Sequence, residues 1–321
     1  MYACIDLGSN SFHLLIGEWD DGRIRIVERC SEKVQLGEAV VTTGLISDAA
    51  FQRGLACLEN FRELMRRHPI RQYWALGTNA FRLARNTPDF LTAARDMGIR
   101  ISVISGVQEA VLIYAGVITS LPLNDERRLI IDIGGGSTEV IAGHGHERIM
   151  TESLPAGTVG WRDRFFAEPS SDKRVLEARM DAGLEAALAI FEPAAAAVAR
   201  AGWDTAYASS GTVKMLKYIC ENHGYGENRI TSAALEELKR TLAAGIAKGG
   251  PLPGLKEERR ELLLPGWCVA AALMKVFDIE VLNFSATALR EGMLDFLVRN
   301  EKTMPIMRAS HLPKVNQASS L

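Results

Sequence analysis

Hydrophobic and polar positions follow strand and helix periods in turn along the chain. Besides two hairpins described below, apolar runs predict strands at 23–28, 73–77, 99–104, 148–150, 205–208 and 280–284. Apolar residues at helical spacing, with starting Ser, Asp or Gly residues, predict helices at 48–67, 88–97, 107–117, 171–201, 231–248 and 261–277. Another helix starts after 211, and a last helix ends near 298. Strands alternating with helices are typical of the α/β class.

One pattern occurs twice. Residues 5–17 and 131–143 each contain an apolar run ending in Asp, a loop of Gly and small polar residues, and a second apolar run. This arrangement predicts a β-hairpin. Five of the thirteen positions are identical, and the Asp, the first Gly and a later Ser are in register. The repeat predicts two related lobes that grip one phosphorylated ligand.

The loops of both hairpins are suited to an anion. Glycines allow bare backbone to approach a ligand, and successive N–H groups in such a loop form an anion-binding concavity. Ser and Asn side chains add donors, as does Thr138. A carboxylate beside a phosphate needs a cation between them, so Asp6 and Asp132 predict Mg²⁺ or Mn²⁺.

Three further segments place polar groups where a predicted strand ends. Thr78 and Asn79 follow the strand at 73–77, and Arg82 lies one turn later, where its guanidinium could bind a phosphate. The turn at 209–212 also joins a strand to a helix start. Glu109 lies in the first turn of its helix, where position alone favours a capping role.

Length and composition limit the organisation of the chain. With 321 residues, 47% hydrophobic and 24% charged, the sequence predicts a globular protein of two domains. The Pro-containing polar stretch at 120–125 is the predicted hinge. The predicted lobes are 1–121 and 122–300, followed by a polar tail at 301–321.

Charge and hydropathy narrow the range of partners and compartments. The net charge of −2 argues against a dedicated nucleic-acid binder. The chain shows no secretory signal and no uninterrupted apolar stretch of the ~18 residues that a membrane span needs, so a cytoplasmic location without a membrane is expected. Helix 48–67 ends in a basic group, for which a solvated face at the helix C-terminus is favoured over a polyanion track. This group comprises Arg62, Arg66, Arg67, His68 and Arg71.

Six segments together resemble the exopolyphosphatase/guanosine pentaphosphate phosphohydrolase family, in the same order along about residues 1–300. They are the loop at 6–13, the turn at 77–82, and the segments at 104–114, 131–139, 208–212 and 288–292. The resemblance implies two RNase H-like lobes of the actin/hexokinase/Hsp70 superfamily around a central cleft. It also implies a Mg²⁺-dependent hydrolase that releases the terminal phosphate from inorganic polyphosphate, guanosine pentaphosphate or both.

The resemblance also assigns roles to residues. Glu109 matches the catalytic glutamate, which replaces the capping role favoured by position, and Arg82 matches the phosphate-contacting arginine. Asp132, Ser137 and Glu139 match the active-site residues of the second loop. The expected metal ligands are Asp6, Asp132 and Glu139. The expected phosphate-binding residues are Gly8, Ser9, Asn10, Ser11, Thr78, Asn79, Gly134, Gly135, Gly136, Ser137, Thr138, Ser210, Gly211 and Thr212.

The sequence departs from the family pattern at Gln108, Val111 and Ala286-Thr287. Loss of charge beside Glu109 is expected to affect rate or chain-length preference rather than remove a catalytic group. The chain is also expected to lack the C-terminal helical domains of long members, so a homodimer would be one way to build a long polyphosphate track. Two alternatives stay open: a catalytically weak sensor of polyphosphate or guanosine tetra- and pentaphosphate, and a sugar or acetate kinase of the same superfamily.

Overall fold

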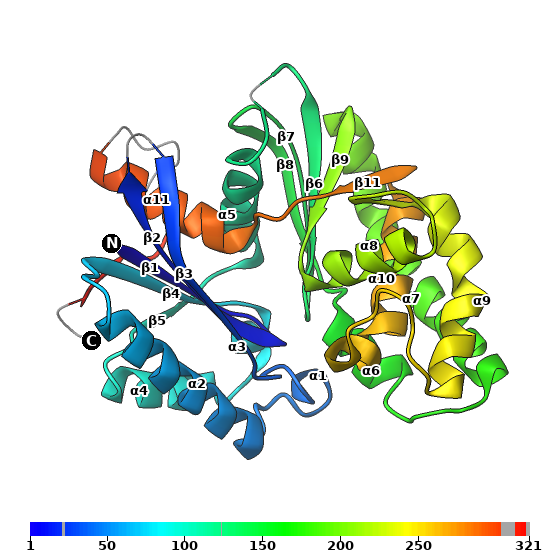
Figure 1. Cartoon of the computed structure of the whole chain (residues 1–321), viewed down its shortest axis with the longest axis horizontal. Helices are drawn as coiled ribbons and strands as arrows, with labels where there is room; N and C mark the ends of the chain where they lie inside the picture. The colour runs from blue at the N-terminus through cyan, green and yellow to red at the C-terminus, as the bar shows by residue number, and fades with distance from the viewer. Residues whose placement is uncertain (21–22, 123, 303–311, 319–321) are drawn as a thin grey trace. The chain divides into compact units, whose positions relative to one another are not determined.

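The computed structural model describes residues 1–20, 23–122, 124–302 and 312–318. The chain forms two compact units, each built on one six-stranded sheet with helices (Figure 1). Unit 1 comprises Met1–Leu121 and Thr287–Leu321, and unit 2 comprises Pro122–Ala286. The predicted α/β class is confirmed, because strands and helices alternate along the chain and both sheets contain parallel and antiparallel pairs.

Unit 1 has the strand order β12-β4-β1-β2-β3, and β5 also pairs with β4. The first hairpin is antiparallel, whereas β1, β4 and β5 run parallel to one another. The strands are β1 (Tyr2–Leu7), β2 (Ser11–Asp20), β3 (Arg23–Lys33), β4 (Gln72–Gly77), β5 (Ile101–Val103) and β12 (Asn316–Gln317). The helices are α1 (Val40–Thr43), α2 (Asp48–Arg66), α3 (Asn79–Leu83), α4 (Thr87–Asp96), α5 (Gly106–Ile118) and α11 (Leu289–Lys302).

Successive side chains of the unit 1 strands pack against helices on opposite faces of the sheet. Tyr73 joins a core cluster with Phe61 of α2 and Phe90 of α4. Its neighbour Trp74 points to the other face and stacks on Phe296 of α11, with ring centroids 5.1 Å apart. Since successive side chains of a strand point to opposite faces, this sheet is covered by helices on both sides.

Unit 2 repeats the arrangement of five of these strands, but its sixth strand has a different partner. Its strand order is β10-β11-β9-β6-β7-β8, with an antiparallel β6-β7-β8 meander and β6 parallel to β9. The strands are β6 (Arg127–Ile133), β7 (Thr138–His144), β8 (Glu147–Leu154), β9 (Thr205–Ser209), β10 (Arg229–Thr231) and β11 (Val281–Phe284). The helices are α6 (Thr158–Phe165), α7 (Lys173–Ala201), α8 (Gly211–Asn222), α9 (Ser232–Lys248), η1 (Glu257–Leu262) and α10 (Leu263–Val276).

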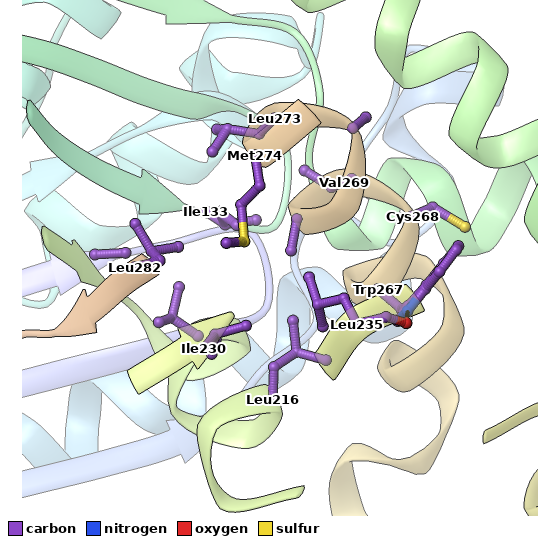
Figure 2. Close-up of a cluster of buried hydrophobic side chains, with 14 of the residues drawn as sticks. Ile133, Leu216, Ile230, Leu235, Trp267, Cys268, Val269, Leu273, Met274 and Leu282 are labelled. Atoms are coloured by element: carbon purple, nitrogen blue, oxygen red, sulfur yellow. Dashed lines mark hydrogen bonds between the residues drawn. The ribbon is translucent and has the colours of Figure 1, made fainter. Parts of the chain in front are cut away.

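The core of unit 2 lies between its sheet and these helices. Figure 2 shows Leu216 of α8, Leu235 of α9 and Met274 of α10 gathered with strand residues such as Leu282. Trp267 is fixed within this cluster because its indole Nε1 donates a hydrogen bond to the Leu235 carbonyl oxygen at 2.7 Å. The Ala-rich helix α7 is long and apolar enough to cross a membrane by length and composition, but one of its faces is buried in this same core.

Two boundaries differ from the sequence-based expectation. Helix α11, expected in the second lobe, belongs to unit 1, where it packs on α5 at the glycines Gly116 and Gly292. The expected polar tail at 301–321 lies partly outside the described residues. Glu301 and Lys302 belong to the end of α11, and Asn316 and Gln317 form β12, which pairs with β4. The N–H of Ala318 donates to the Arg71 carbonyl oxygen at 3.0 Å. Pairing with β12 thus satisfies backbone groups at this edge of the sheet.

Candidate functional site

The carboxyl ends of three parallel strands bring the predicted residues of unit 1 together. Leu7 of β1 is in register with Gly77 of β4, which is in register with Val103 of β5. The loops that follow these strands are therefore neighbours, and the N–H of Thr78 donates to the Leu7 carbonyl oxygen at 3.3 Å. In open α/β sheets, ligands bind outside these strand ends.

Glu109 and Arg82 form a buried ion pair at this edge. Arg82 Nη1 lies 2.8 Å from Glu109 Oε2 and also donates to the Ile104 carbonyl oxygen at 2.9 Å. The side chains are 21% and 11% exposed. Burial raises the pKa of Glu109, and the Arg82 guanidinium opposes that rise. The pair thus presents a carboxylate with an elevated pKa, held in one orientation by an arginine that has further donors.

The helix that carries Glu109 is capped by other residues. Ser105 Oγ accepts a hydrogen bond from the Gln108 N–H, and Gln108 Oε1 accepts one from the Ser105 N–H. This is a capping box, which satisfies two N–H groups at the start of α5. Glu109 is therefore not needed as a cap, and Gln108, a departure from the family pattern, has a structural role.

The two glycine loops have the same turn. The Gly8 N–H donates to the Ser11 carbonyl oxygen at 3.2 Å, and the Gly134 N–H donates to the Ser137 carbonyl oxygen at 2.9 Å. A Cβ at either glycine would lie 3.0–3.1 Å from that same oxygen. Successive N–H groups in turns of this kind can form an anion-binding concavity. The sequence repeat therefore corresponds to a repeated local structure.

The carboxyl ends of β6 and β9 build the matching edge of unit 2. Asp132 is in register with Ser209 of β9 and with Glu139 of β7. Asp132 accepts a hydrogen bond from Ser209 Oγ, and Glu139 Oε1 accepts one from Ser153 Oγ at 2.8 Å. Two carboxylates at directly opposed strand positions are close enough to serve one cation.

The arrangement of these carboxylates suits Mg²⁺, which rarely takes all of its ligands from the protein. Within the described ranges, no group of three or more His, Cys, Asp or Glu side chains is assembled for a metal. Asp132 and Glu139 belong to unit 2 and Asp6 to unit 1. Mg²⁺ is commonly held by one or two carboxylates, with waters and substrate phosphates completing its octahedron, so an oxygen pair of this kind suits it.

Other predicted phosphate ligands divide into two groups. Ser210, the N-cap of α8, has φ of 106°, a left-handed value that non-glycine residues rarely adopt and that is often found at functional sites. Its Oγ accepts a hydrogen bond from the Val213 N–H at 3.2 Å. In contrast, the structure does not expose the hydroxyl of Thr138, which is fully buried and donates to the Ala156 carbonyl oxygen at 2.6 Å. Thr212 is also buried, and its methyl group packs beside Gly266.

Arg259 of η1 lies at this site and was missed by sequence reasoning. A Cβ at Gly211, the first residue of α8, would lie 2.5 Å from both terminal nitrogens of the Arg259 guanidinium, so the guanidinium rests on this backbone. Burial lowers the pKa of Arg259 and the charge of the Glu258 carboxylate opposes that shift, although no salt bridge among the described residues involves Arg259. A cation at the positive end of a helix is unfavourable unless an anion lies nearby. The sequence holds no local signal for this contact, because η1 is 46 residues from Gly211 (257 − 211).

Comparison with known proteins places these features in context. Residues 15–301 match the sequence profile of the Ppx/GppA phosphatase family. An exopolyphosphatase from Cytophaga hutchinsonii is similar in structure, with 25% sequence identity and a TM-score of 0.80, covering 96% of this chain and 99% of that one. The Ppx/GppA family member of Aquifex aeolicus has 24% identity and a TM-score of 0.73, covering 94% and 99%. A protein described as exopolyphosphatase-like has 21% identity and a TM-score of 0.81 over 94% and 99%.

Proposed function

This chain belongs to the Ppx/GppA phosphatase family, and on that premise we propose that it hydrolyses the terminal phosphate of inorganic polyphosphate, guanosine pentaphosphate or both, with Mg²⁺. The observation that carries the proposal is the buried Glu109–Arg82 pair beside the Gly8 loop. Phosphoryl transfer to water requires an oriented water and neutralised phosphoryl oxygens, and this edge offers a group for each.

Glu109 is the proposed base that orients or deprotonates the attacking water. A base works best when its pKa lies near the working pH, and burial shifts the pKa of Glu109 in that direction. Arg82 holds the carboxylate through Nη1. A guanidinium has five donors, so Arg82 keeps others for a phosphate oxygen while it orients Glu109.

Backbone N–H groups of each glycine loop are proposed to bind phosphate oxygens. Asp132 and Glu139 of unit 2 are proposed ligands of Mg²⁺, and Asp6 is a proposed ligand in unit 1. When bound, the ion would neutralise charge that develops on the phosphoryl oxygens. Ser209 and Ser153, which donate to the two unit 2 carboxylates, would keep those carboxylates in position.

The test is phosphate release by the purified protein from long-chain polyphosphate, tripolyphosphate and guanosine pentaphosphate, side by side. Release with Mg²⁺ that stops with EDTA and returns when Mg²⁺ is added in excess is the expected result. If none of the substrates is turned over although binding persists, the protein is a sensor rather than a hydrolase. Production of ADP that depends on ATP and a second acceptor would instead indicate a kinase.

Arg259→Gln is expected to raise the KM for the phosphate substrate by roughly ten- to a hundred-fold. The reason is the loss of a charge-assisted hydrogen bond, which is worth about 1.5–3 kcal/mol. Steady-state kinetics of phosphate release measure the change. The matched control is Lys256→Gln, which removes an exposed cation just before η1 and is expected to leave KM unchanged. Equal KM values for both variants would remove Arg259 from the site.

A further inference from the structure

Unit 1 carries five exposed arginines at the end of its sheet opposite to the catalytic pair. Arg66 and Arg67 end α2, Arg95 lies in the last turn of α4, and Arg71 and Arg100 directly precede β4 and β5. We call these five residues the basic edge. The residues of the proposed active site follow the carboxyl ends of the same strands, so the length of the strands separates the two places.

Three sets of contacts bring these arginines together. Arg62 Nη1 donates to the Met97 carbonyl oxygen at 2.7 Å, which ties the end of α2 to the end of α4. Figure 1 shows the end of α2, the N-terminus and the start of β4 on the same side of unit 1. The N-terminal ammonium of Met1 donates to the Pro69 carbonyl oxygen and so adds another cation to this side.

The segments before β4 and β5 are joined as well. The Tyr73 hydroxyl accepts a hydrogen bond from the Arg100 N–H at 3.0 Å. Strand β12 bridges both segments, because Asn316 Nδ2 donates to the Arg100 carbonyl oxygen at 3.1 Å and the Ala318 N–H donates to that of Arg71. The basic edge is therefore assembled by tertiary structure from parts of the chain that are distant in sequence.

The basic edge carries an excess of positive charge in a protein whose net charge is −2. Glu63 and Asp96 are exposed carboxylates in the same segments, and Glu59 is paired with Arg62. In the part of the chain that the structure describes, no salt bridge involves any of the five arginines.

Helix dipoles account for only part of this cluster. The C-terminus of a helix attracts cations, which explains arginines at the ends of α2 and α4. Arg71 and Arg100 instead precede strands of a mixed sheet, and β-sheets have only small net dipoles. A polyanionic ligand accounts for all five, because guanidinium groups bind phosphate oxygens through paired donors.

We propose that the basic edge binds the distal part of a long polyphosphate chain whose terminal phosphate lies at the active site. This inference rests on the proposed function, since the same molecule must reach both places. The six residues of β4 span roughly 20 Å. Tripolyphosphate is too short to occupy both ends of the sheet, whereas a long chain is not. A second attachment on one molecule raises the effective concentration of its end at the active site.

The first test compares substrates of two lengths in the quadruple variant Arg66→Gln, Arg67→Gln, Arg71→Gln and Arg100→Gln. The KM for long-chain polyphosphate is expected to rise at least tenfold at low salt, with kcat and the KM for tripolyphosphate unchanged. The difference should shrink at high salt, because screening weakens exposed charges. The matched control removes four exposed cations of unit 2, at Arg174, Arg200, Arg240 and Lys248, and is expected to change neither KM.

A direct binding measurement makes the result independent of turnover. Long-chain polyphosphate is titrated against the Glu109→Gln protein with and without the four substitutions, and at least a tenfold loss of affinity is expected. Equal affinity of the two proteins for polyphosphate would overturn the proposal. The same titration is made with RNA, and loss of RNA binding in the substituted protein with polyphosphate binding intact would overturn the proposal as well. If the native protein hydrolyses no polyphosphate, the proposed function fails, while this titration still decides whether the basic edge holds the polyanion.

Discussion

Glu109→Gln is expected to lower kcat for phosphate release by about two to four orders of magnitude, with KM changed little. General-base catalysis contributes ~10²–10⁴-fold, and an amide cannot accept the proton of water. Substrate contacts through the glycine loops and Arg259 remain in this variant, so binding should persist. Phosphate release at saturating substrate and separate titration of substrate binding measure the two effects.

This substitution is nearly isosteric and should leave α5 intact. The capping box of that helix is formed by Ser105 and Gln108 rather than by Glu109. Ser105→Ala removes this capping box and should cost about 1 kcal/mol of stability, with turnover largely kept. This variant is therefore the structural control. If Glu109→Gln retained turnover within a few-fold of the native protein, the base would have to be another group.

Gly116→Ala and Gly292→Ala are expected to be the most destabilising single methyl additions in unit 1. A Cβ at Gly116 would lie 1.8 Å from the Ala288 carbonyl oxygen, and one at Gly292 would lie 1.8 Å from the Leu112 carbonyl oxygen. Both clashes are with backbone, so no side chain can rotate away and the two helices must separate. Overpacking typically costs about 1–3 kcal/mol, and this rigid contact should reach at least the upper value.

Thermal unfolding measures the effect. A loss of about 3 kcal/mol should lower Tm by roughly 6–12 °C in a domain of this size. Gly250→Ala is the matched control, since a Cβ there meets nothing within 4 Å, and its stability should stay within about 0.5 kcal/mol of the native protein. Equal Tm values for the three variants would show that α5 and α11 do not pack as closely as described.

The sequence determined most of the elements because their signals are local. The period of apolar residues in α2, the residues that start the helices and the repeated Asp-x-Gly loops each act within a few residues, and all were predicted close to where they lie. The repeat also predicted two related units. Its physical basis is visible in the identical turns at Gly8 and Gly134.

Features that depend on distant partners were decided only by tertiary structure. The position of Arg259 required η1 to fold over Gly211, and the buried state of Thr138 required the Ala156 carbonyl oxygen as its acceptor. Helix α11 joined unit 1 because Gly116 and Gly292 let two backbones touch, a property of the pair that neither segment encodes alone. Local spacing thus fixed where strands, helices and glycine loops begin, while close packing between distant segments decided which side chains face a ligand and which are buried.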